Sequence, residues 1–274
     1  MCELLTEAVS YGFMQRALIV GVLMSLCAGV LGVHLVLKRF SMIGDGLSHV
    51  GFAALALASV LHFSPLAVSL PLVIAAAFFI LWAQGHSEIQ GDAMVGVLSI
   101  GALAFGMILI ALTTGVNADV NSYLFGSILS MNKTDVVLSV TLCAGVFILY
   151  ILFYQRVFAV TFDETFAQAT GTPTGYYQAV LSLMTAVTIV VGMRVVGALL
   201  ISGLIIFPAL SAMRLCRRYR SVVIVAAVLS PVCCVIGLLL SFFCSAPAGA
   251  GIILVQLAAY LLTVFISILR GRSA

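Results

Sequence analysis

Residues 43–58, IGDGLSHVGFAALALA, form an apolar run with the character of a membrane-spanning helix, although it contains an acid and an imidazole. Similar runs recur along the whole chain of 274 residues, of which 64% are hydrophobic and only 8% are charged. Roughly a quarter of the residues of a soluble domain are charged, so this chain lacks the polar residues needed to cover a water-exposed surface. We therefore predict an all-α, polytopic membrane protein in which residues 1–274 form a single helical bundle.

Nine apolar runs approach the length needed to cross about 30 Å of hydrocarbon. The sixth and seventh are separated only by the stretch GMRVVG, so eight spans are an alternative to nine. The predicted spans are residues 17–37, 46–62, 65–83, 93–113, 135–154, 177–193, 195–212, 221–243 and 249–269.

The distribution of Lys and Arg predicts an outer N-terminus and an inner C-terminus. With this orientation, nine of the 12 basic residues lie in inner loops, as the positive-inside rule requires. The longest inner segment, about residues 155–175, includes FDETFAQATG at 162–171. That stretch predicts a short amphipathic helix with Asp163 and Glu164 at its start, where acids suit the helix dipole, and with Gly171 at its end.

Asp45 and His49 are the most informative polar residues in the apolar runs. Positions four apart on a helix share one face and are roughly 6 Å apart along the axis. A carboxylate oxygen and an imidazole nitrogen are both ligands for zinc, manganese or ferrous iron. The pair therefore predicts a metal-binding site; the alternative is a helix-starting acid at the membrane surface with His49 hydrogen-bonded to a neighbour.

Three other residues in apolar surroundings have simpler interpretations. His34 is expected to form a hydrogen bond between helices, and Arg194 to extend toward the membrane surface or to cap backbone carbonyls. Pro208, inside a predicted span, is a candidate helix hinge.

Several blocks of the chain, in this order, resemble the permease subunits of ABC-type importers of zinc, manganese and iron. The blocks are LVLKRFSMIGDGLSHVGFAALALA (35–58), SYLFGSIL (122–129), FDETFAQATG (162–171), VVGALLISGLIIFPALSAMR (195–214) and APAGAGIILVQLAAYLL (246–262). The resemblance implies a homodimer around a central metal path, two cytoplasmic ATP-binding subunits and an extracytoplasmic metal-binding protein that delivers the ion. It also implies a metal-binding role for Asp45 and His49. The residues expected to couple to the ATP-binding subunit are Asp163, Glu164, Ala167 and Gly171.

We do not expect the chain to be an enzyme, because it contains no GxxxxGK[ST] phosphate loop and ATP hydrolysis must then belong to a separate subunit. The transported ion, zinc first and manganese or ferrous iron next, would be cargo and not a permanently bound cofactor. We expect a multi-pass protein of a prokaryotic cell membrane, in contact with lipid and not with nucleic acid.

Two alternatives to a metal-ion permease remain open. One is an ABC permease for a metal chelate or cobalamin. The other is an ion-coupled secondary transporter that uses Asp45 as a proton site, although the remaining acids lie at span ends or in loops. An intramembrane aspartyl protease is disfavoured, because Met42 stands where the Gly-x-Gly-Asp context of such enzymes needs its first glycine.

Overall fold

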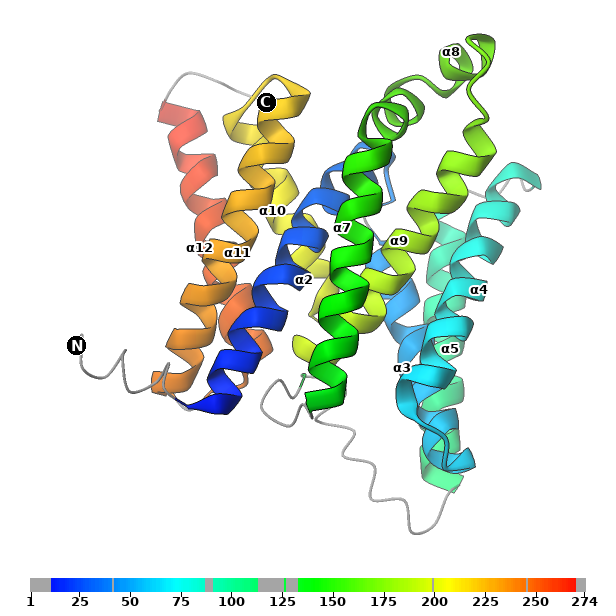
Figure 1. Ribbon diagram of the computed structural model, residues 1–274, viewed down its shortest axis with the longest axis vertical. Helices are drawn as coiled ribbons and strands as arrows, with labels where there is room; N and C mark the ends of the chain where they lie inside the picture. The colour runs from blue at the N-terminus through cyan, green and yellow to red at the C-terminus, as the bar shows by residue number, and fades with distance from the viewer. Residues whose placement is uncertain are drawn as a thin grey trace.

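The computed structural model describes residues 11–40, 42–86, 91–112, 126, 133–198, 200–244 and 246–269. Within these ranges every regular element is a helix, and the long helices run side by side between two ends of the molecule (Figure 1). Their bounds are α2 Gly12–Leu37, α3 Ile43–Leu61, α4 Pro65–His86, α5 Gly91–Leu112, α7 Lys133–Phe162, α8 Glu164–Ala169, α9 Thr174–Val195, α10 Ile201–Leu215, α11 Tyr219–Cys244 and α12 Ala248–Leu269. The all-helical fold predicted from composition is confirmed.

Eight of the described helices are long and apolar enough to cross a membrane. The predicted span at 195–212 corresponds to α10, which has only 15 residues. At 1.5 Å per residue α10 is about 22 Å long, shorter than the roughly 30 Å of hydrocarbon in a bilayer. The prediction of eight or nine spans is thus confirmed, and α10 is the helix that made the number ambiguous.

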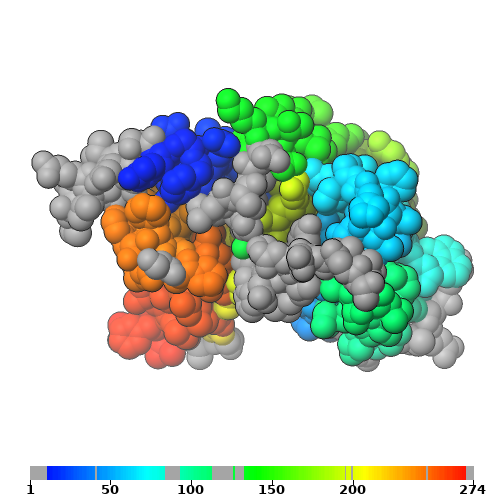
Figure 2. Space-filling view, turned by 90° about the horizontal axis from the view of Figure 1, so that it is seen from below, coloured from blue at the N-terminus to red at the C-terminus, as the bar shows by residue number. Residues whose placement is uncertain are grey.

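The helices form two groups, which α7, α9 and a contact between α3 and α10 connect. In one group α2, α10 and α11 pack against one another and α12 packs against α10 and α11; in the other α3 packs against α4 and α5. Figure 2, viewed from the end opposite α8, shows α11 and α12 on one side of the molecule and α4 and α5 on the other. The most enclosed spans are α2 and α3, whereas α5, α7 and α12 expose most of their length. The Asp45–His49 pair is therefore carried by a central helix.

Small residues allow the backbones within these groups to approach closely. A Cβ built on Gly32 of α2 would lie 2.1 Å from the carbonyl oxygen of Ile205 in α10. A Cβ on Gly237 of α11 would lie 2.4 Å from the Cα of Ile252 in α12. Contacts of this kind require glycine and are typical of helices packed within membranes.

The longest helix, α7, has 30 residues and is about 45 Å long, more than the hydrocarbon thickness requires. Its predicted span ended at residue 154, and the helix that contains this span continues to Phe162. Gln155 and Arg156 make the sequence polar at this point, but neither residue stops a helix. The first part of the predicted coupling segment therefore belongs to α7.

The α2–α3 turn lies at the same end of the molecule as α8, because the Lys38 ammonium nitrogen is 3.6 Å from a carboxylate oxygen of Glu164. The start of α2 lies at the opposite end (Figure 1). We take the α8 end as cytoplasmic because basic residues of the α2–α3 and α10–α11 connections lie there, as the positive-inside rule requires. The predicted outer block SYLFGSIL falls outside the described residues apart from Gly126.

Candidate functional site

The Asp45–His49 pair occupies the first two turns of α3, which begins at Ile43. The Asp45 side chain is 33% exposed and that of His49 only 8%, and 3.5 Å separates Asp45 Oδ1 from His49 Nε2. This distance is long for a hydrogen bond. Two ligand atoms that each lie about 2.1 Å from one tetrahedral zinc ion are roughly 3.4 Å apart. The two atoms are therefore spaced as ligands of a shared ion would be.

One serine side chain, from α5, lies within reach of the Asp45 carboxylate. The Ser99 hydroxyl of α5 donates a hydrogen bond to Asp45 Oδ2 at 3.4 Å. The Ser48 hydroxyl donates to the backbone carbonyl of Asp45 at 2.8 Å and so does not contact the carboxylate. His49 Nδ1 is buried and has no hydrogen-bond partner in the described part of the chain. The carboxylate is thus oriented from α5, with one side left open.

The glycines on either side of Asp45 place the pair between two other helices. A Cβ on Gly44 would lie 3.3 Å from the Cα of Ser202 in α10, and one on Gly46 would lie 2.5 Å from a methyl group of Val95 in α5. Among the described ranges, no cluster of three or more His, Cys, Asp or Glu side chains is arranged to hold a metal. One copy of the chain therefore supplies two such ligands here.

The coupling segment is a six-residue helix, α8, with well-formed ends. Asp163 is its N-cap, and its carboxylate accepts a hydrogen bond from the Phe166 N–H at 2.8 Å. Gly171 follows the helix in the left-handed region, at φ +80°, where glycine is favoured. The predicted start and stop of this helix are both confirmed.

The side chains of α8 divide into an inner and an outer set. Ala167 is 1% exposed and packs α8 against the rest of the chain. Phe166, in contrast, is 65% exposed, and Glu164 is exposed as well. A cytoplasmic partner would contact the outer set. Phe166 belongs to this set, although the sequence analysis did not identify it as a candidate.

Comparison with known proteins identifies the family. The sequence matches the ABC 3 transport family over residues 10–267. The chain belongs to the ABC 3 transport family. It is a multi-pass membrane permease subunit of the metal-importing ABC transporters and is not itself an ATPase.

Curated relatives match over nearly their whole length. The zinc uptake membrane protein ZnuB of Haemophilus influenzae is 31% identical over 252 residues, covering 91% of this chain and 95% of the relative. The manganese transport membrane protein MntC of Halalkalibacterium halodurans is 30% identical over 267 residues, covering 97% and 91%. The names of these two relatives give different metals, although the two are almost equally similar to this chain.

Solved structures confirm the arrangement of the helices. The structure of PsaBC from Streptococcus pneumoniae in complex with Fab matches with a TM-score of 0.87 and 28% identity, covering 97% of this chain and 96% of the other. An inward-facing ABC transporter, described as of the metal-chelate type, matches with a TM-score of 0.74 at 14% identity and shares the fold alone.

At the end of this ABC 3 permease opposite α8, an ion pair joins two helices. The Arg194 guanidinium donates to both carboxylate oxygens of Asp135, at 2.9 and 3.0 Å. This ion pair was not predicted from the sequence, and extension of Arg194 toward the membrane surface stays a prediction. The pair fixes the end of α9 against the start of α7.

Two further predictions concern residues inside helices of the permease. Pro208 is buried within α10, which continues through it from Ile201 to Leu215, and its role as a hinge stays a prediction.

His34 is fully buried in α2, with Nε2 3.0 Å from the Tyr150 hydroxyl of α7 and 2.7 Å from the Tyr219 hydroxyl of α11. Its expected role as a hydrogen-bonding link between helices is confirmed.

Proposed function

We propose that this permease forms the membrane path for a divalent transition metal in an ATP-driven importer, with zinc as the first candidate. The observation that carries the proposal is the 3.5 Å separation between Asp45 Oδ1 and His49 Nε2. Neighbouring ligands of an octahedral ion at about 2.2 Å would be roughly 3.1 Å apart, whereas those of tetrahedral zinc are about 3.4 Å apart. The observed spacing fits one divalent ion bound by both side chains, and the uptake measurement distinguishes zinc from manganese.

A second copy of the chain is the partner that the site needs. Two protein ligands leave two positions of a tetrahedral ion open, and the exposed side of Asp45 gives access to them. Next to it, α5 exposes Val97 at 74% and Ile100 at 72%, an apolar surface suited to another helix or to lipid. A homodimer whose copies face each other here would surround the ion with two carboxylates and two imidazoles. Sites that bind with few ligands from each side also release the ion readily.

The remaining subunits are assigned to the two ends of the molecule. ATP-binding subunits would dock on the coupling segment at the cytoplasmic end, where Phe166 and Glu164 are exposed and Asp163 and Gly171 fix the ends of α8. Ala167, buried beneath them, would hold the segment in place. A metal-binding protein would deliver the ion at the opposite end. Within this chain Asp45 and His49 would bind the ion, and Ser99 would orient the carboxylate.

The metal content of starved cells tests the proposal. Cells that make this permease with its partner subunits are compared with cells that make the Asp45→Asn/His49→Gln variant, which keeps polar side chains of similar size but weakens the ligands. We expect zinc to rise only with the wild type, measured by elemental mass spectrometry at equal permease levels in the membrane. A Gly145→Ala variant is the matched control, because no atom lies within 4 Å of the added Cβ.

The outcomes separate the alternatives. Equal metal uptake by the wild type and the double variant would refute the role of the pair. A rise in manganese and not zinc would correct the ion while leaving the site in place. No rise in any metal, despite assembly with an active ATP-binding subunit, would favour a permease for a metal chelate.

A further inference from the structure

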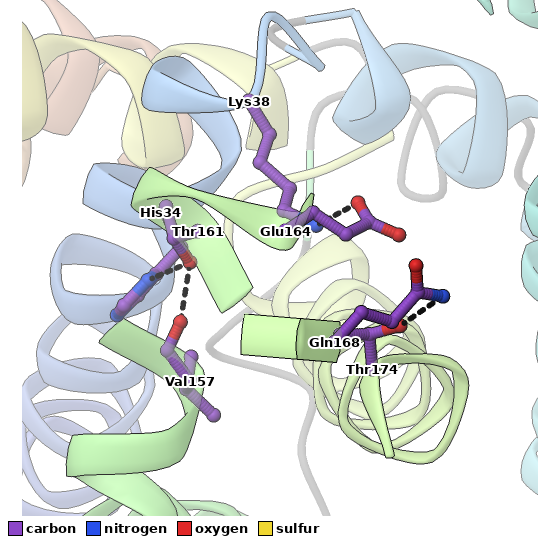
Figure 3. Close-up of polar contacts among 7 residues, drawn as sticks. All are labelled: His34, Lys38, Val157, Thr161, Glu164, Gln168 and Thr174. Atoms are coloured by element: carbon purple, nitrogen blue, oxygen red, sulfur yellow. Dashed lines mark hydrogen bonds and ion pairs between the residues drawn. The ribbon is translucent and has the colours of Figure 1, made fainter. Parts of the chain in front are cut away.

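The last turn of α2 is attached at two points to the chain that leads into α8 (Figure 3). Lys38 Nζ lies 3.6 Å from Glu164 Oε2, at the start of α8. One turn earlier on α2, His34 Nδ1 lies 3.0 Å from the Thr161 hydroxyl, in the last turn of α7. The two attachments lie on either side of the break between α7 and α8, so they bridge the joint that a docked subunit would push.

The donor and the acceptor in the hydrogen bond between His34 and Thr161 can be assigned. The Thr161 hydroxyl already donates to the Val157 carbonyl at 2.6 Å, so it accepts the hydrogen bond from Nδ1–H of His34. His34 Nε2 is then an acceptor with one lone pair, and of the two nearby hydroxyls that of Tyr219, at 2.7 Å, lies closer than that of Tyr150, at 3.0 Å. With its donor and its acceptor both engaged, the imidazole is fixed between α2, α7 and α11, and the end of α7 follows the end of α2.

The attachment through Lys38 is an ion pair in a partly closed environment. The Lys38 side chain is only 12% exposed, and this burial lowers the pKa of its ammonium group, while the Glu164 carboxylate acts in the opposite direction. A charged group with so little access to water is stabilised by an opposite charge and is not easily separated from it. Glu164 is therefore held to the α2–α3 turn.

The α2–α3 turn itself is tightly closed. The Phe40 N–H donates to the Leu35 carbonyl at 2.8 Å, and the Ile43 N–H donates to the Phe40 carbonyl at 3.1 Å. Arg39 occupies the left-handed position, at φ 62°, that ends such a helix. Asp45 follows in the first turn of α3. A displacement of Lys38 thus reaches Asp45 through a short, hydrogen-bonded stretch of backbone.

Open space beside the two attachments leaves them room to move. A cavity of about 440 Å³ has Lys38, Ile43 and Glu164 on one side. Residues of α4 and α9, including Ile80 and Leu181, form the other side. The α8–α9 contact is limited to the far end of α8, where Gln168 donates to the Thr174 hydroxyl at 3.3 Å, so the cavity borders Lys38 and Glu164 on the side that faces α4 and α9.

We propose that Lys38 and His34 are positioning residues of the transport cycle, which join the coupling segment to the α2–α3 turn so that movement of α8 displaces Asp45. The proposal rests on the proposed docking of ATP-binding subunits on α8. It assigns to Lys38 and His34 no contact with the ion. Their effect is on the coupling between ATP hydrolysis and metal movement.

Charge reversal in the complete transporter, reconstituted in vesicles, tests the proposal. In Lys38→Glu, repulsion from Glu164 breaks the attachment. We expect ATP hydrolysis and subunit assembly to persist while zinc uptake per ATP falls by roughly tenfold, because a typical coupling free energy between two sites corresponds to a change of about this size. The double variant Lys38→Glu/Glu164→Lys restores the pair and should recover uptake. Arg39→Glu, the same charge change at the next, exposed position, is the matched control.

Three results would overturn the proposal: normal uptake per ATP in Lys38→Glu, an equal loss in Arg39→Glu, or no recovery in a double variant that still co-purifies with the ATP-binding subunit. A readout that needs no metal separates this proposal from the proposed function. Spin labels replace Met42, before α3, and Ala169, at the end of α8, both of them exposed. We expect ATP to leave their separation constant in the wild type and to change it in Lys38→Glu; a change in the wild type would refute the joined movement even if no metal is transported.

Discussion

Replacement of Gly32 by alanine tests the closest approach between α2 and α10. The added Cβ would lie 2.1 Å from the carbonyl oxygen of Ile205. Carbon and oxygen atoms in contact are normally about 3.3 Å apart, so the two helices would have to separate by roughly 1.2 Å. The obstructing atom belongs to the backbone, and no change of side-chain rotamer can move it away.

The expected loss of stability is large for a single methyl group. Overpacking a close-packed interior costs about 1–3 kcal/mol, and a rigid backbone contact belongs at the upper end, near 3 kcal/mol. For a chain of this size each kcal/mol corresponds to roughly 2–4 °C in Tm, so we expect Gly32→Ala to lower Tm by about 6–12 °C.

Thermal unfolding of the detergent-solubilised permease, followed by fluorescence, measures this shift. Gly145→Ala in α7 is the control, because no atom lies within 4 Å of its added Cβ. In that variant the higher helix propensity of alanine, up to about 1 kcal/mol, should leave Tm unchanged or slightly raised. If Gly32→Ala and Gly145→Ala differ in Tm by less than about 1 °C, the reasoning about the α2–α10 contact is refuted.

Three further predictions concern the ion pair and the ends of α8. Arg194→Gln leaves the Asp135 carboxylate without its bidentate partner and should lower stability by about 1–3 kcal/mol in the same unfolding assay, with partial recovery in the charge-swapped double variant. Asp163→Ala removes the acceptor of the Phe166 N–H and should cost about 1 kcal/mol, seen as faster amide hydrogen exchange in α8, whereas Asp163→Asn should show little change. Gly171→Val should cost about 1–2 kcal/mol, because φ is +80° there although no atom obstructs a Cβ, and should reduce the amount of ATP-binding subunit that co-purifies. Gly171→Asn, which tolerates this conformation better, should have the smaller effect, and equal yields from both variants would contradict the strain argument.

Local chemistry explains which parts of the fold could be predicted from the sequence. A membrane helix satisfies its backbone hydrogen bonds within its own segment, so apolar runs of bilayer length predicted the spans. The ends of α8 were predictable because Asp163 and Gly171 act on neighbouring backbone groups. The continuation of α7 beyond its predicted span was missed, because the polar residues after 154 were taken as the start of the cytoplasmic segment although none of them stops a helix.

Local sequence patterns could not predict the contacts around the candidate site and at the opposite end of the molecule, because these contacts join residues that lie far apart in the sequence. Ser99 is 54 residues from Asp45, and Asp135 is 59 residues from Arg194. No local periodicity links residues so far apart; only the tertiary packing of α5 on α3 and of α9 on α7 brings them together. The i, i+4 spacing did predict that Asp45 and His49 lie together, and metal binding by them stays a prediction.

Because α7 is longer than the bilayer is thick, a subunit that docks at α8 would lie at a distance from the bilayer surface. Gln155 and Arg156 suit the level of the lipid headgroups, and the six residues from there to Phe162 raise the end of α7 by roughly 9 Å. This height is comparable to the Debye length of about 8 Å at physiological ionic strength. At that height the potential of anionic lipids falls to roughly a third, so the protein surfaces, more than the lipid composition, should determine how tightly a subunit would bind at α8.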